Sequence, residues 1–131
     1  MTKKAINLKE TSFTQAINIS AQWCKEWEED LLSEEVLADR VAELIKTKSG
    51  LRGFFAYALS DQNCYLLDKL PFSFVFKLQE AGNDVVEIVI KNLIMSSAQI
   101  IVHESDNNLE YKSNSENISE RCKNILRVLE T

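Results

Sequence analysis

The chain has 131 residues, of which 45% are hydrophobic, so it can form one domain with a packed core and is too apolar to be disordered. Its formal net charge of −5 argues against a nucleic-acid-binding protein, which needs a basic face. Three glycines and one proline stand where average usage predicts about fifteen such residues, so we expect a single all-α domain of five or six helices over residues 1–131.

The N-terminal residues 1–10 are polar, and we expect them to be frayed. They lack the apolar run of about 7–15 residues that a secretory signal needs. A cytoplasmic protein is therefore expected.

The first helix is predicted from about residue 12 to residue 29, where apolar residues recur at helical spacing. Its stripe consists of Phe13, Ile17, Cys24 and Trp27, with the small Ser20 in the remaining place. Trp23 and Trp27 are adjacent on this helix, and Trp23 lies at the edge of the stripe. Because tryptophans are enriched at interface hot spots, Trp23 and Trp27 are candidate interface residues.

A second helix is predicted to begin after Ser33, a favourable N-cap residue, and to end at Gly50. The short link between the first two helices predicts an antiparallel hairpin. Acidic residues gather at this corner, and we expect them to form a solvated surface: Glu26, Glu28, Glu29, Asp30, Glu34 and Glu35.

Two apolar segments, 54–59 and 72–78, fit either a helix or a strand. Pro71 before the second segment and Gly82 after it favour a helix there. We predict helices at both places, and the alternative is an α+β fold with short strands at 54–59 and 72–78.

The longest predicted helix runs from Asp84 to about Glu104 and opens with a capping box formed by Asp84 and Glu87. Its broad apolar content predicts the buried central helix of the fold. Residues 85–102 are the best candidate for a membrane span, but Glu87 and Lys91 within them favour a soluble helix and no membrane. A last helix is predicted after Asn114 or Ser115, with an apolar stripe at Ile118, Cys122, Ile125 and Leu129.

Polar residues at Asn92, Ser96, Gln99 and His103 share one face of this long helix. A serine with a nearby histidine is a possible nucleophile pair, but Ser96 and His103 lie about 10 Å apart along the axis, too far for a hydrogen bond. We expect a polar stripe that faces solvent or a neighbouring subunit.

The sequence contains no metal or cofactor motif. It has one histidine, no phosphate-binding loop and no dinucleotide fingerprint. Cys24, Cys64 and Cys122 are odd in number, widely spaced and without a C-x-x-C, so they are expected to be buried free thiols. No cofactor is expected.

These patterns predict a non-enzymatic cytosolic interaction or regulatory protein that binds a protein partner. The apolar content exceeds what one small domain needs to cover, which predicts a homodimer. The alternative is a small-molecule-binding protein or small enzyme with a helix-lined pocket near Gln99 and His103.

Overall fold

The structure is a computed structural model that describes residues 10–129, so the segment expected to be frayed lies almost wholly outside the described residues. Six helices follow one another: α1 (Phe13–Glu28), α2 (Glu34–Leu44), α3 (Lys48–Ser60), α4 (Phe72–Ala81), α5 (Asn83–Ser105) and α6 (Leu109–Leu129). No strand occurs within residues 10–129, which confirms the all-α prediction. The α+β alternative is wrong, because segments 54–59 and 72–78 lie within α3 and α4.

Helix caps explain several of these boundaries. The Ser12 hydroxyl accepts a hydrogen bond from the Gln15 backbone amide, and the Gln15 side-chain oxygen accepts one from the Ser12 backbone amide, so α1 opens with a full capping box. Ser33 caps α2 as predicted, by accepting a hydrogen bond from the Val36 amide.

Gly50 does not end α2, and that prediction is wrong. Helix α2 ends at Leu44, and Gly50 lies in the first turn of α3, where its amide donates to the Thr47 hydroxyl. A Cβ at Gly50 would lie 1.9 Å from the Leu44 carbonyl oxygen. The glycine is therefore needed for the close approach of the two helix ends, and not for a C-terminal stop.

Gly82 ends α4 as predicted, with a positive φ of 69°. The same residue is the N-cap of α5, and no side chain caps that helix. The predicted capping box of Asp84 and Glu87 is therefore wrong, because α5 begins directly after this turn.

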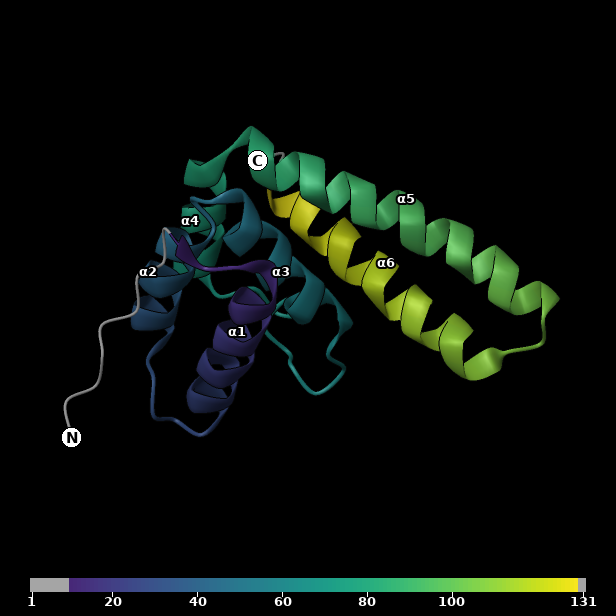
Figure 1. The fold of residues 1–131 in the computed structure, drawn as a ribbon, viewed down its shortest axis with the longest axis horizontal. Helices are drawn as coiled ribbons and strands as arrows, with labels where there is room; N and C mark the ends of the chain where they lie inside the picture. The colour runs from purple at the N-terminus through teal and green to yellow at the C-terminus, as the bar shows by residue number, and fades with distance from the viewer. Residues whose placement is uncertain (1–9, 130–131) are drawn as a thin grey trace.

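The helices form a body and a projecting hairpin (Figure 1). Helices α1 to α4 make the body, in which α1 packs mainly against α3 and α2 mainly against α4, and α1 and α2 also contact each other. Helices α5 and α6 run side by side and extend away from the body. Helix α6 starts earlier than predicted, because residues 106–108 suffice for the turn and Asn108 accepts a hydrogen bond from the Tyr111 amide.

The core lies inside the body and at the adjoining end of the hairpin. Its largest fully buried side chains include Phe55, Phe74, Leu59, Leu78 and Ile125. Helix α5 contributes Val85, Val89 and Ser96 as buried residues, and most of its length is exposed. The prediction of a buried central helix is therefore wrong, since α5 lies along one side of the molecule with α6 as its main neighbour.

Candidate functional site

Cys24 and Cys64 form a disulfide that joins α1 to the loop between α3 and α4. Their Cα atoms lie 6.6 Å apart, and both side chains are buried, at 3% and 1% exposed. The prediction of three free thiols is wrong for this pair. It holds for Cys122, which is free and buried, and burial raises the pKa of its thiol to about 11.

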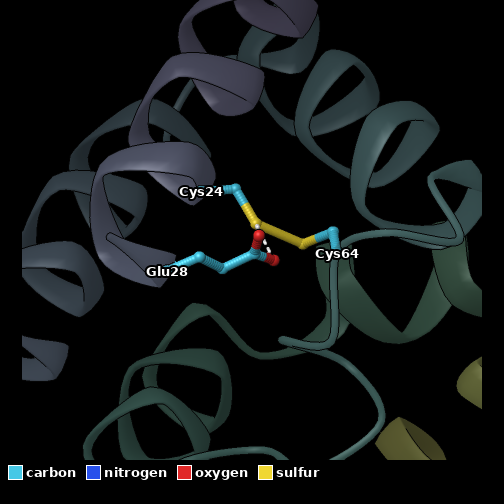
Figure 2. A group of neighbouring side chains, drawn as sticks. All are labelled: Cys24, Glu28 and Cys64. Atoms are coloured by element: carbon cyan, nitrogen blue, oxygen red, sulfur yellow. Dashed lines mark hydrogen bonds between the residues drawn. A yellow bond between two sulfur atoms is a disulfide. The ribbon is translucent and has the colours of Figure 1, made fainter. Parts of the chain in front are cut away.

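Glu28 lies one helical turn after Cys24 on α1 and directs its carboxylate at the two sulfur atoms (Figure 2). Its Oε1 atom is 3.7 Å from Cys24 Sγ. One ligand atom from each of Cys24, Glu28 and Cys64 lies within 4.8 Å of the others. Glu28 is exposed, as expected for the acidic corner, but its carboxylate points toward the sulfur pair and not away from it.

Arg121 fixes the loop that carries Cys64. This arginine is 3% exposed and donates hydrogen bonds from Nη1 to the carbonyl oxygens of Ala58, Leu59 and Asp61. Its Nη2 atom donates to the Cys64 carbonyl at 2.8 Å. Nε and Nη2 also pair with both carboxylate oxygens of Asp68, at 3.0 and 3.1 Å.

The guanidinium of Arg121 thus donates hydrogen bonds to the carbonyl oxygens at the end of α3 and holds the following turn in place. The last carbonyl oxygens of a helix have no partner within the helix, so they need such donors. Arg121 is a functional residue that the spacing of apolar residues does not reveal, although it directly precedes the inward-facing Cys122 on α6.

Tyr57 makes a polar contact with the loop that carries Cys64. Its hydroxyl donates a hydrogen bond to Asp61. Burial, this hydrogen bond and the negative charges of Asp61 and Glu28 raise the pKa of Tyr57 well above its usual value. The phenol is therefore held as a neutral donor.

The predicted polar stripe on α5 faces α6 over part of its length. Ser96 is buried, and its hydroxyl lies 2.8 Å from that of Ser119 on α6. His103 contacts the ring of Tyr111, 5.5 Å between centroids. Asn92 bonds the Ile88 carbonyl of its own helix, and Gln99 is exposed. The four residues form no shared catalytic geometry.

Trp23, a candidate interface residue, is 7% exposed and belongs to the core. The Arg40 guanidinium lies 6.0 Å from the centre of its ring. Trp27 is half-buried and packs against the core. Neither tryptophan side chain is exposed on a single chain in the way that an interface hot spot would be.

A large exposed apolar surface lies on α5. We call it the outer face of α5 and define it by Ile90, Ile94, Met95, Ala98, Ile101 and Val102. Ile94, Met95 and Ile101 are 65%, 61% and 70% exposed. Helix α5 is thus apolar on two sides, since Val85 and Val89 are buried toward the core while these aliphatic side chains face outward.

Helix α5 is also long and apolar enough to cross a membrane, judged by length and composition alone. The charged residues Asp84, Glu87 and Lys91 lie in its first turns. Along its length it pairs with α6, which carries six charged side chains that are not buried: Glu110, Lys112, Glu116, Glu120, Lys123 and Arg127.

Two grooves lie away from Gln99 and His103. The larger, of about 830 Å³, runs between the start of α3 and the first half of α5, with Phe13, Lys48, Arg52, Glu87 and Lys91 in its lining. The smaller is lined by residues of α2 and α4 and the start of α5. Neither groove reaches the predicted pocket.

Fold and site together define a small all-α protein with a projecting helical hairpin and a two-cysteine, one-carboxylate cluster. The family described as "Uncharacterised conserved protein UCP020893" matches residues 12–131, and the chain belongs to this family. No curated protein and no solved structure matches the chain.

Proposed function

We propose that the chain is a non-enzymatic cytosolic protein that acts through protein–protein contacts, and that its first partner is a second copy of itself, bound through the outer face of α5. The observation that carries this proposal is the exposure of Ile94, Met95 and Ile101 side by side on a helix that projects from the body.

The size of the face supports a homodimer. Its large side chains expose on the order of 500 Å² per chain, at the upper end of what soluble monomers leave uncovered. Two such faces together bury about 1,000 Å², which is the lower limit for a stable interface before flanking residues are added.

The spacing on α5 supports helix-to-helix contact. Ile90, Ile94, Ala98 and Ile101 follow one another at steps of four, four and three, the spacing of a seam between packed helices. Two hairpins joined along this seam form a four-helix bundle. Glu87 and Lys91 lie at one end of the seam and Asp106 beyond the other, so its middle is apolar and its rim is charged.

A membrane is the less favoured occupant. A charge at the centre of a bilayer costs about 2.5–3.5 kcal/mol on the insertion scale, and the charged α6 lies against α5 along its length. A second copy covers the outer face and leaves α6 in water.

The test is light scattering after size exclusion at tens of micromolar. Wild-type protein is expected to have twice the mass of one chain. Ile94→Glu buries an unpaired charge in the seam, so it should weaken association by about 2 kcal/mol or more, roughly thirtyfold. Gln99→Glu adds the same charge on an exposed site outside the outer face and should leave the mass unchanged.

A wild-type protein with the mass of one chain contradicts the homodimer. If that protein also binds anionic lipid vesicles and Ile94→Glu abolishes the binding, the outer face is a membrane surface instead.

A further inference from the structure

The Cys24–Glu28–Cys64 cluster gathers three atoms of the kind that hold a metal ion. They come from α1 and from the loop before α4, and each lies within 4.8 Å of the others. Two cysteines and a carboxylate form a soft, negatively charged donor set when the cysteines are reduced. Such sets select zinc over magnesium or calcium, which prefer oxygen ligands.

The disulfide does not explain the position of Glu28. A disulfide sulfur carries no proton, so it offers the carboxylate no hydrogen bond, yet Oε1 lies 3.7 Å from Cys24 Sγ. Within residues 10–129, no lysine, arginine or histidine forms an ion pair with Glu28. A carboxylate that points at two sulfur atoms and has no ion-pair partner among these residues is suited to bind a metal cation.

The backbone geometry suits a metal. The Cα atoms of the two cysteines lie 6.6 Å apart, near the wide end of the range of about 4.4–6.8 Å that disulfides span, so the thiols can part without a large backbone shift. The 3.7 Å between Cys24 Sγ and Glu28 Oε1 is close to the spacing of about 3.5 Å between sulfur and oxygen ligands of a tetrahedral zinc.

Both sides of the cluster are held by fixed backbone. Cys24 and Glu28 lie one turn apart on the same face of α1, and the Cys64 carbonyl is bonded to Arg121. The two cysteines close the site on the protein side, and the exposed Glu28 closes it toward solvent.

We infer that the reduced chain binds one zinc ion through Cys24, Glu28 and Cys64, with a solvent molecule at the fourth position. Binding replaces the two thiol protons by Zn²⁺, so two protons are released for each ion bound. The disulfide and the zinc complex exclude each other, because a disulfide has no thiolate to offer. This inference is independent of the proposed homodimer.

The test is a zinc titration of the full chain against a chromophoric chelator, after reduction with a phosphine and removal of the reductant under argon. Reduced wild-type protein is expected to take up one equivalent of Zn²⁺. The same protein oxidised at Cys24 and Cys64 is expected to take up none, which gives a comparison without any substitution.

Variants locate the ligands. Cys24→Ser and Cys64→Ser should abolish binding, and Glu28→Gln should weaken it about tenfold or more, with helix content checked by circular dichroism. Glu29→Gln removes a neighbouring exposed carboxylate and should bind as the wild type does. The inference is overturned if reduced wild-type protein binds no zinc, or if Cys64→Ser binds as tightly as the wild type.

Discussion

Arg121 is the residue on which the loop between α3 and α4 depends most. It is nearly fully buried, and its guanidinium reaches four backbone carbonyl groups and the Asp68 carboxylate. A buried charge with all its partners is stable, whereas removal of one partner leaves the others without hydrogen bonds in a place that water does not reach.

We expect Arg121→Ala to lower the free energy of unfolding by about 3–5 kcal/mol, because it leaves these carbonyl groups and Asp68 without partners. Arg121→Lys should also lower the free energy of unfolding by much of this amount, since one ammonium group cannot make all the hydrogen bonds of the planar guanidinium. Urea unfolding measures both variants. Arg127→Ala, on the exposed side of the same helix, should change stability by less than about 0.5 kcal/mol, and an equally small effect at Arg121 would contradict the account.

Cys122 makes the free energy of unfolding depend on pH in the alkaline range. Burial raises the pKa of its thiol from an ordinary value of 9.0 to about 11, so the unfolded chain loses this proton at a lower pH than the folded chain. The protonated thiol therefore contributes fully to the free energy of unfolding below about pH 9, and this contribution is lost as the pH rises toward 11.

Between pH 8 and pH 11 the wild type should therefore lose on the order of 2–3 kcal/mol more free energy of unfolding than Cys122→Ala, which has no thiol. Urea unfolding at the two pH values gives the difference. Equal losses in both proteins would show that other groups control the alkaline unfolding.

Single residues were predicted unevenly from the sequence. Ser33 and Gly82 were identified because caps and stops depend on their own neighbours in the chain. The pairing of Cys24 with Cys64 was not, because 40 residues separate them and only the packing of α1 on α3 brings them together. Glu28 was taken as one of six corner acids, since its direction is set by the same packing.

At the scale of elements, the packing of α1 on α3 depends on Gly53. A Cβ at this position would lie 2.4 Å from the Ala16 Cβ and 2.8 Å from the Phe13 carbonyl oxygen. Both neighbours belong to α1 and cannot rotate away. The small residue therefore sets how closely the two helices approach, and with it the distance across the Cys24–Cys64 cluster.

We expect Gly53→Ala to lower the free energy of unfolding by about 1–3 kcal/mol, although alanine is the better helix former by nearly 1 kcal/mol. Ser49→Ala at an exposed position of the same helix is the control and should change stability little. Thermal unfolding followed by circular dichroism compares them. A more stable Gly53→Ala variant would mean that helix propensity outweighs the contact.

The positions of the helices along the chain were largely predictable from the sequence. Which helices are buried and which are exposed was not. The positions of α1, α4 and α5 follow from the sequence, whereas α2 ends well before the predicted stop at Gly50 and α6 begins several residues earlier than predicted. Helix α5 was expected to be buried because aliphatic residues occupy most of its sides. Periodicity cannot tell a helix covered by its own domain from one that a second chain covers, so its exposure emerged only from the fold.

At the scale of the whole molecule, the body buries its apolar side chains in a core of its own. The hairpin of α5 and α6 leaves part of its apolar side chains exposed. The apolar stripe of α6 is covered within the chain, where Cys122 and Ile125 are fully buried. The outer face of α5 stays exposed on a single chain, and so do Phe72 and Phe76 on α4. A second copy of α5 is the partner that we propose for the outer face.

The most direct measurement of this claim is the rate at which hydrogen peroxide oxidises Met95, followed by mass spectrometry of the peptide that contains it. Met95 is 61% exposed on a single chain and lies next to Ile94, at the edge of the proposed seam. At tens of micromolar, the account predicts that Met95 oxidises several times more slowly in the wild type than in Ile101→Glu, in which the seam is broken. Equal rates in the two proteins would contradict it, because they would show that nothing covers the outer face of α5.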